Sequence, residues 1–240
     1  MTTFSTKNQA ALVTGASSGI GQAIAKALAA NEVRVCLTGR NTKRLTETAT
    51  LCGAGTIWQA ADLADEASTQ KLVEFVREIV GRLDILVHSA GIYHMCKSED
   101  AATVDLDGVF RVNARAPFIL TRELLPLLRE SKGQIVFINS SAALHAGPYT
   151  GLYAASKSAL KSLADTLRIE VNPDEVRVIS VYPGRTATPM QAQIHSLEGK
   201  PYHPDRLIQP ADIATSVICA LRLPRTAEIT DLFVQPMLRS

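Results

Sequence analysis

Short apolar runs alternate along the chain with longer segments that have helical periodicity. The runs expected to form strands are 10–14, 33–38, 56–61, 84–88, 134–139, 176–182 and 228–234. The segments expected to form helices are 20–30, 42–51, 66–80, 103–130, 152–171 and 211–221. Strand and helix alternate throughout, which predicts an α/β fold with a parallel sheet covered by helices on both faces.

Two segments depart from this alternation. The helical segment 103–130 contains Pro117 and Pro126. Proline lacks the N–H of a helical hydrogen bond, so we expect a bend or break near each of them. Segment 191–209 is polar, contains prolines and has poor helical or strand patterning. We therefore expect a lid or substrate loop at about 185–209, within one domain that spans residues 1–240.

Composition and charge exclude several classes of function. The 240 residues are 46% hydrophobic, which is enough for one well-filled domain, and no linker divides them. The net charge of +2 provides no strong field for nucleic acid or an anionic membrane. Segment 1–9 is short and polar, without the apolar core of a signal peptide, and no apolar run is long enough to cross a bilayer. We expect a cytoplasmic protein without nucleic-acid or membrane partners.

The cysteines give no sign of a metal site. Cys36, Cys52, Cys96 and Cys219 are widely spaced and form no CxxC pair. Disulfide frameworks and metal clusters are therefore not expected, and a reducing compartment fits this pattern.

A glycine-rich turn lies between the first strand and the first helix. Its sequence is Thr-Gly-Ala-Ser-Ser-Gly-Ile-Gly at positions 14–21. Glycines let the backbone approach a pyrophosphate, and the free N–H groups of a helix start face the anion. Glycine spacing alone is a weak signal, but its place between a strand and a helix near the N-terminus favours a dinucleotide site.

The residue after the second strand predicts the type of dinucleotide. An acid at this place would bind the two ribose hydroxyls of NAD. Here Thr38 is followed by Gly39, Arg40 and Asn41, with no acid. The Arg40 guanidinium suits a 2′-phosphate, so NADP(H) is expected in preference to NAD(H). The alternative is that Arg40 only opens the next helix.

Two further strand ends carry candidate cofactor contacts. Asp62 and Leu63 close the third strand, and Asp62 could accept from an adenine amino group, cap the next helix, or do both. Ala90 and Gly91 follow the fourth strand, where Gly91 permits close approach of the backbone to a cofactor.

A tyrosine and a lysine four residues apart provide a candidate acid/base. Tyr153 and Lys157 would lie one turn apart on the same helical face. A phenol titrates at about 10, and a nearby ammonium lowers its pKa toward the working pH. Ser140, at the end of an apolar strand, can donate a hydrogen bond to a substrate carbonyl oxygen. Such a pair also arises by chance on solvated helix faces. The glycine turn and Asn113, a polar amide among apolar neighbours, favour the catalytic interpretation.

Taken together, these residues resemble the short-chain dehydrogenase/reductase family over nearly the whole chain. The resemblance depends on Thr14-Gly15, Gly19-Ile20-Gly21, Asp62-Leu63, Ala90-Gly91, Asn113, Ser140, Tyr153, Lys157, Pro183-Gly184, Thr186 and Thr188, all in the expected order. It implies a single-domain, Rossmann-like, doubly wound parallel sheet of about seven strands with helices on both faces.

The resemblance also implies roles for particular residues. The implied catalytic tetrad is Asn113, Ser140, Tyr153 and Lys157. Tyr153 would donate a proton to the carbonyl oxygen, Lys157 would also bind the nicotinamide ribose, and Asn113 would hold a water that links Lys157 to solvent. The implied cofactor-binding residues are Gly15, Ser17, Ser18, Gly19, Ile20, Gly21, Arg40, Asp62, Leu63, Ala90, Gly91, Tyr153, Lys157, Pro183, Gly184, Thr186 and Thr188. Ser141 is a neighbouring hydroxyl, but the spacing from Tyr153 favours Ser140.

The chain departs from the family pattern at three places. His88 and Ser89 replace the paired asparagines usual before Ala-Gly, which puts the hydrogen bonds of that turn in doubt. NADP-preferring members often have a basic residue where this chain has Ser18. The segment 228–236 lacks the Asp-Gly-Gly ending common in oxoacyl-carrier-protein reductases.

The function expected first is an NADP(H)-dependent oxidoreductase that interconverts a ketone or aldehyde and an alcohol. A rival within the family is a 3-oxoacyl-carrier-protein reductase, although Asp174 and Glu175, before the sixth strand, would repel an acidic carrier. An alternative of another class is a non-catalytic NADP(H)-sensing or scaffold protein.

The expected partner is a small-molecule substrate in an apolar pocket with a few polar tips. The expected pocket walls are Tyr93, His94, Ala142, Leu144, His145, Tyr149, Met190 and Ile194. The small-residue face of segment 152–171 and the long segment 103–130 predict a homodimer or homotetramer.

Overall fold

A computed structural model describes residues 9–238. The expectation for segment 1–9 therefore lies, apart from Gln9, outside the described residues. Seven strands form one parallel sheet in the order β3-β2-β1-β4-β5-β6-β7. The strands are β1 (Ala10–Thr14), β2 (Arg34–Gly39), β3 (Ile57–Ala60), β4 (Ile85–His88), β5 (Gln134–Ile138), β6 (Arg177–Pro183) and β7 (Asp231–Val234). The expected doubly wound, Rossmann-like parallel sheet is confirmed.

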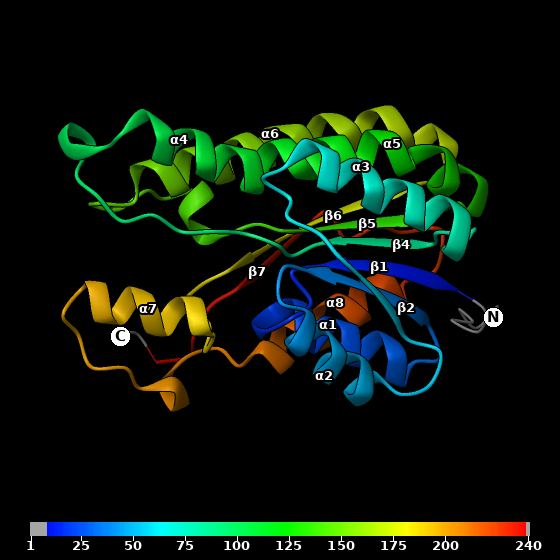
Figure 1. The fold of residues 1–240 in the computed structure, drawn as a ribbon, viewed down its shortest axis with the longest axis horizontal. Coiled ribbons are helices and arrows are strands. Elements are labelled where there is room, and N and C mark those ends of the chain that lie inside the picture. Colours follow the sequence, from blue (N-terminus) through cyan, green and yellow to red (C-terminus); the bar gives the residue numbers. More distant parts are fainter. Residues whose placement is uncertain (1–8, 239–240) are drawn as a thin grey trace.

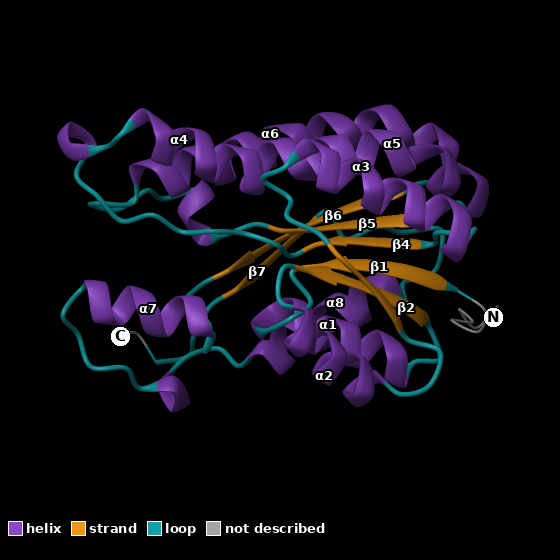
Figure 2. Ribbon diagram, in the orientation of Figure 1, coloured by secondary structure: helices purple, strands orange, loops and turns teal. Residues whose placement is uncertain are grey.

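Helices cover the two faces of this sheet (Figures 1 and 2). On one face lie α1 (Gly19–Ala30), α2 (Thr42–Cys52) and α8 (Pro210–Leu221). On the other face lie α3 (Glu66–Phe75), α4 (Thr103–Phe110), α5 (Ala116–Ser131) and α6 (Gly151–Val171). Within residues 9–238, none of the helices has the length and apolar character needed to span a membrane.

The two layers depend on the alternating direction of side chains along each strand. In β1, Ala10 and Leu12 belong to the core cluster that also contains Leu120 of α5. Ala11 and Val13 belong to the opposite cluster, with helix α1. Both faces of the strand are buried, which explains why its sequence is apolar at every position.

The segment expected to be an irregular lid contains a helix, α7 (Pro189–Leu197). That part of the prediction is wrong. The Thr188 side chain caps the helix by accepting a hydrogen bond from the backbone N–H of Gln191, and Pro189 occupies the first turn. Helix α7 lies outside the two layers that cover the sheet, beyond the ends of β6 and β7 (Figure 1).

The long helical segment 103–130 changes its geometry near the first of its two prolines, as expected, but not at the second. Helices α4 and α5 are joined by a π turn at Arg111–Arg115, which ends two residues before Pro117. Pro126 lies inside α5 without ending it, so the expected break there is wrong. The π turn carries Asn113, which brings an unusual stretch of backbone next to a candidate catalytic residue.

Strands β1 and β4 are neighbours in the sheet, but the chain leaves them in opposite directions. β1 is followed along the chain by α1 and β2 on one side, whereas β4 pairs with β5 on the other. In open parallel sheets such a switch point opens a crevice at the carboxyl ends of the strands. This edge of the sheet lies near α7 in Figure 1.

Candidate active site

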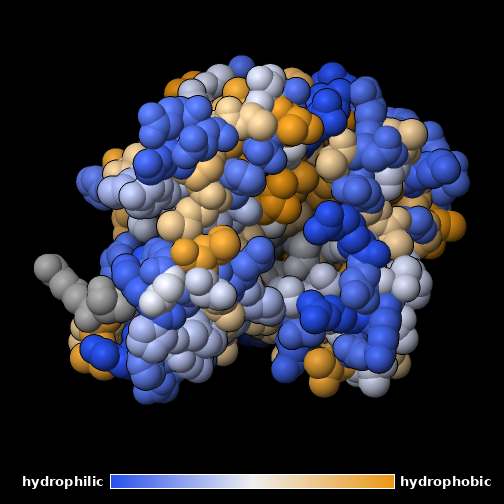
Figure 3. Space-filling model, turned by 60° about the vertical axis from the view of Figure 1, so that its left-hand side comes forward, coloured by the Kyte–Doolittle hydropathy of each residue, from blue (hydrophilic) through white to orange (hydrophobic). Residues whose placement is uncertain are grey.

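A cleft of about 780 Å³ occupies the carboxyl edge of the sheet. It reaches from the glycine-rich turn after β1 to the turn that precedes α7. Figure 3 turns this side of the molecule forward, and a hollow is visible near the middle of that face. We therefore compared the residues that line this cleft with those that the sequence predicts to bind a dinucleotide.

The glycine turn brings two backbone segments unusually close. A Cβ on Gly15 would lie 2.8 Å from the Cα of Ala90, and one on Gly21 would lie 2.5 Å from the carbonyl oxygen of Gly15. Gly15 also has a φ of 65°, which disfavours other residues. Ser18 precedes α1 without a side-chain cap, so the first N–H groups of the helix are left for another acceptor. This cradle fits a pyrophosphate.

Thr14 stabilises the turn after β4, where the family's paired asparagines are missing. Its Oγ1 accepts hydrogen bonds from the backbone N–H of Ser89 at 3.0 Å and of Ala90 at 3.1 Å. The doubt that His88 and Ser89 raised about this turn is therefore answered by a residue of β1. The backbone of this turn lines the cleft.

His88 is a buried neutral histidine below the site. Its Nε2 lies 2.8 Å from the hydroxyl of Thr121, and its ring stacks on Phe137. Burial, with a contribution from the positive charge of Lys157, lowers the pKa of His88 to about 3. The ring thus adds no charge beside the lysine at neutral pH.

The end of the cleft where the adenosine of a dinucleotide would lie is basic. The exposed side chains of Arg40 and Arg44 both line it. Asn41 caps α2 by accepting a hydrogen bond from the N–H of Arg44, which places Arg44 in the first turn of that helix, beside the cleft. The sequence predicted only that Arg44 adds to the positive field. Its place beside the cleft depends on where α2 begins, which the sequence pattern did not specify.

Asp62 lines the cleft but does not cap the following helix. Asp65 is the cap of α3 and accepts a hydrogen bond from the N–H of Ser68. The Asp62 carboxylate accepts from the N–H of Ala64 in a local turn. The capping alternative for Asp62 is therefore wrong.

Tyr153 and Lys157 project from the first turns of α6 into the cleft. The Lys157 Nζ lies 5.9 Å from the centre of the Tyr153 ring. The same Nζ donates a 2.8 Å hydrogen bond to the carbonyl oxygen of Ile138, at the end of β5. Lys157 is buried, and burial lowers its pKa to about 8. The lysine is still mainly an ammonium at neutral pH.

The pKa of Tyr153 departs from its ordinary value in the direction opposite to our expectation. Burial raises the pKa of the phenol, a side-chain hydrogen bond with Ser140 opposes this effect, and Tyr93 adds to it. Lys157 is not among the causes of the shift. The expected acidification by the ammonium is therefore not seen in this structure. The raised pKa keeps the phenol protonated at neutral pH, which suits a proton donor.

Ser140 follows β5 and begins a short 3-10 turn at Ser141–Ala143. Its Oγ accepts a hydrogen bond from the backbone N–H of Ala142 at 3.1 Å. The hydroxyl hydrogen can be donated to the Tyr153 oxygen or to the carbonyl oxygen of a substrate. Ser140 and Ser141 both line the cleft, and Ser140 is the one whose hydroxyl acts on Tyr153.

Asn113 differs from the other three tetrad candidates because it is fully buried and does not line the cleft. Its amide donates to the carbonyl of Ile92 and to Ser156 Oγ, and its carbonyl oxygen accepts from the N–H of Ile92. A Cβ on Gly91 would lie 3.4 Å from the Asn113 side-chain oxygen and 3.7 Å from the Lys157 Nζ. Asn113 thus fixes the backbone beside the lysine.

Every residue predicted to bind the cofactor lines the cleft. These residues are Gly15, Ser17, Ser18, Gly19, Ile20, Gly21, Arg40, Asp62, Leu63, Ala90, Gly91, Tyr153, Lys157, Pro183, Gly184, Thr186 and Thr188. All of these residues line one cleft that includes the glycine cradle. The lining of the cleft therefore fits a dinucleotide.

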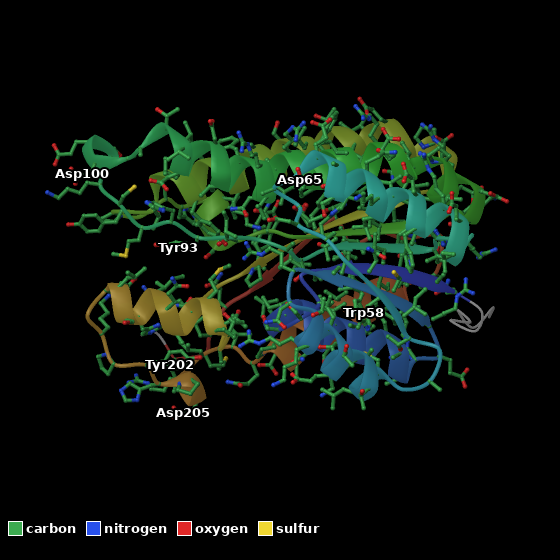
Figure 4. All side chains as sticks on the ribbon, in the orientation of Figure 1. Trp58, Asp65, Tyr93, Asp100, Tyr202 and Asp205 are labelled. Carbon is green, nitrogen blue, oxygen red and sulfur yellow. The ribbon has the colours of Figure 1, made fainter. Side chains whose placement is uncertain are left out.

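Half of the expected pocket walls lie on the cleft. Tyr93, Ala142, Met190 and Ile194 line it, whereas His94, Leu144, His145 and Tyr149 do not. Figure 4 shows Tyr93 between the layer that contains α4 and helix α7. Its ring centre is 5.1 Å from that of Tyr153.

Two charged residues on either side of α7 were missed by sequence reasoning. Arg185, after β6, and Glu198, after α7, line the cleft and form a bidentate ion pair. The two residues are 13 positions apart, so no local sequence pattern predicts that they pair.

Comparisons with known proteins agree with this geometry. A family model described as short chain dehydrogenase matches residues 9–199. An uncharacterized short-chain type dehydrogenase/reductase of Sinorhizobium fredii is 35% identical over 234 residues, covering 95% of this chain and 91% of the relative.

Solved structures give the same picture. An alcohol dehydrogenase of Thermococcus sibiricus, complexed with 5-hydroxy-NADP, is similar with a TM-score of 0.87 and 28% identity, covering 97% of this chain and 98% of that one. A 3-ketoacyl-(acyl-carrier-protein) reductase of Brucella melitensis, complexed with NADH, has a TM-score of 0.86 and 28% identity, with coverage of 96% and 98%.

Proposed function

The chain belongs to the short-chain dehydrogenase/reductase family and is an oxidoreductase, and from this premise we propose that it interconverts a ketone or aldehyde and the corresponding alcohol with NADP(H). The observation that carries the proposal is the convergence of Ser140, Tyr153 and Lys157 on the cleft whose other end is the glycine cradle. A proton donor, a hydrogen-bond donor and an ammonium then surround one position.

The residues divide the chemistry of carbonyl reduction among them. Bound NADPH would supply a hydride to the carbonyl carbon. Tyr153, protonated at neutral pH, donates its proton to the carbonyl oxygen, while the Ser140 hydroxyl donates a hydrogen bond to the same oxygen. Lys157 would bind the nicotinamide ribose and keep a positive charge beside the cleft.

Asn113 is proposed to connect Lys157 to solvent through a water. Its side chain is occupied by Ile92 and Ser156. Its backbone carbonyl, however, lacks the usual donor four residues later, because that residue is Pro117. This carbonyl, in the π turn, is the acceptor that we assign to the water.

The preference for NADP(H) rests on the basic adenosine end of the cleft. Arg40 and Arg44 would face a 2′-phosphate, and β2 is followed by no acid that would bind the ribose hydroxyls of NAD. Similar structures hold 5-hydroxy-NADP in one case and NADH in another, so the side chains of this protein carry the argument. Helix α7 and its flanking turns are proposed as the lid over the nicotinamide end.

A 3-oxoacyl-carrier-protein reductase is the second candidate, favoured by the similarity to the Brucella enzyme. The acidic turn at Asp174 and Glu175, which we expected to repel an acidic carrier, is only weak evidence against this candidate. Asp174 pairs with Arg129, and Glu175 pairs with Lys132. This turn also precedes β6, whereas the cleft lies at the carboxyl ends of the strands.

A substrate screen tests the proposal. The protein is mixed with NADPH, and with NADH in parallel, and a panel of ketones, aldehydes, keto esters and an acyl-carrier substrate is followed by NADPH absorbance. We expect turnover of free carbonyl compounds, faster with NADPH. Turnover of the carrier substrate alone would favour the second candidate. No turnover of any carbonyl would favour a non-catalytic, nucleotide-sensing protein.

The protein is also proposed to form a homodimer or homotetramer. Large apolar side chains are exposed on the outer helices, among them Val104 of α4, Phe118 of α5 and Ile169 of α6. Light scattering at micromolar concentration measures the mass directly, and a monomeric mass would contradict this part of the proposal.

A further inference from the structure

Three charged residues form a cluster at the substrate end of the cleft. Glu198 accepts two hydrogen bonds from Arg185, at 2.6 and 3.0 Å, and lies 3.1 Å from the Lys200 Nζ. Two cations and one anion leave this cluster with a net charge of +1. Glu198 and Arg185 line the cleft, whereas Lys200 does not and is largely exposed.

The backbone holds both members of the bidentate pair in place. The carbonyl of Arg185 accepts a hydrogen bond from the N–H of Ile208, and Thr186 pairs with Ile208 in a short bridge. The N–H of Glu198 donates to the carbonyl of Ile194 at the end of α7. The carboxylate orients the guanidinium rather than leaving it free to rotate.

Arg185 lines the cleft and retains unused hydrogen-bond donors. A guanidinium has five N–H donors, and two of them bind Glu198. Among residues 9–238, the remaining side-chain donors of Arg185 have no protein acceptor. Glu198, in contrast, has both carboxylate oxygens engaged by cations, and only 16% of its side chain is exposed. The cluster therefore offers donors and positive charge to a ligand, not a free carboxylate.

Tyr93 places this cluster within reach of a substrate at Tyr153. The rings of Tyr93 and Tyr153 are 5.1 Å apart between centres. The charges of Glu198 and Arg185 both act on the Tyr93 hydroxyl. Tyr93 is thus close both to Tyr153 and to the charged cluster.

We propose that Arg185, oriented by Glu198, is a specificity residue that binds a carboxylate on the substrate, so that this enzyme acts on oxo acids whose carboxylate lies some distance from the carbonyl. The inference rests on the proposed reductase function. In the reaction, the carbonyl carbon gains a hydride from NADPH and the oxygen gains a proton through Tyr153, giving a hydroxy acid and NADP⁺. The carboxylate is unchanged.

The test compares matched substrates that differ only in charge. Straight-chain methyl ketones of increasing spacer length, each ending in a carboxylate, a methyl ester or a trimethylammonium group, are assayed for kcat/KM at saturating NADPH. The full-length protein is compared with Arg185→Met and with Arg185→Met combined with Glu198→Gln, which avoids leaving an unpaired carboxylate. Lys200→Met is the matched control, because it removes a charge from the same cluster without altering the cleft.

A charge-assisted hydrogen bond predicts that the best carboxylate is preferred over its ester by about tenfold or more. This preference should disappear in both Arg185 variants, with the ester still reduced, and should persist in Lys200→Met. Reduction of esters without a preference for any acid would overturn the inference and leave the proposed function intact. Three other results would also overturn the inference but leave the proposed function intact. These are a carboxylate preference that survives the loss of Arg185, a preference for a trimethylammonium ketone, and an effect of Arg185→Met on the KM for NADPH alone. No turnover of any substrate would overturn both.

Discussion

The Nζ of Lys157 donates a 2.8 Å hydrogen bond to the carbonyl oxygen of Ile138. Ile138 is the last residue of β5, two positions before Ser140, and Lys157 lies one helical turn beyond Tyr153 on α6. This single contact joins the strand that carries the serine to the helix that carries the tyrosine. It also holds the Lys157 ammonium beside the cleft in a buried position, and this burial lowers the pKa of the lysine.

The buried ammonium predicts how activity depends on pH. Burial lowers the pKa of Lys157 to about 8, so its positive charge is present below pH 8 and is lost as pH rises through this value. Tyr153 has a raised pKa and stays protonated over this range. The kcat/KM for reduction should therefore fall above about pH 8. In Lys157→Met the activity should be low and this limb absent, whereas Lys161→Met, which alters a half-buried lysine one turn further along that does not line the cleft, should keep it. A profile of the wild type that stays flat to pH 10 would contradict the assignment.

Thr14 and Thr38 form a matched pair for testing the turn after β4. They are register partners in β1 and β2, and both are buried. Thr14 accepts two backbone hydrogen bonds, whereas the Thr38 hydroxyl has no partner among the described residues. Thr14→Val should lower the free energy of unfolding by about 1–3 kcal/mol, because two N–H groups lose their acceptor. Thr38→Val should be neutral or slightly stabilising. Urea denaturation measures both, and equal effects would show that the Thr14 contacts do not matter.

The close approach at Gly15 predicts a loss of cofactor binding. Gly15→Ala would place a Cβ 2.8 Å from the backbone of Ala90 at a residue with positive φ. The turn must shift, so affinity for NADPH should fall by about tenfold or more. Gly108→Ala is the control, since a Cβ there meets nothing within 4 Å and alanine favours the helix. Titration of NADPH fluorescence distinguishes them, and unchanged affinity in Gly15→Ala would contradict the proposed cradle.

Arg40 should decide between the two dinucleotides. Arg40→Ala removes a guanidinium from the adenosine end of the cleft and should weaken NADPH by about tenfold while leaving NADH nearly unchanged. Lys43→Ala provides the comparison, because Lys43 is exposed nearby and does not line the cleft. Dissociation constants for both nucleotides are measured with all three proteins. An equal loss of affinity for NADPH and NADH in Arg40→Ala would count against the 2′-phosphate contact.

The features that sequence reasoning predicted are those whose cause is local. The glycine turn follows from residues within one strand–helix connection, and the spacing of Tyr153 and Lys157 follows from one turn of one helix. The strand runs are apolar because both faces of the sheet are covered. The helix at α7 was also locally encoded, by Thr188 and Pro189, and its polar composition hid that signal.

The features that sequence reasoning missed depend on contacts between distant residues. Thr14 binds the backbone of Ser89 across 75 positions of the chain. Arg185 and Glu198 lie on either side of α7, 13 positions apart, and their side chains meet only in the folded chain. The pKa of Tyr153 depends on how deeply the phenol is buried and on which neighbours reach it, neither of which a spacing of four residues specifies.

The central claim is that the Tyr153 phenol transfers a proton beside Lys157, and its most direct test is the rate of NADPH oxidation by Tyr153→Phe with a carbonyl substrate that the wild type reduces. NADPH binding is followed in parallel, and Tyr149→Phe, which removes an exposed hydroxyl away from the cleft lining, is the control. We predict that Tyr153→Phe still binds NADPH but reduces the substrate about a hundredfold more slowly or worse, while Tyr149→Phe is nearly unaffected. Full activity of Tyr153→Phe would contradict the account.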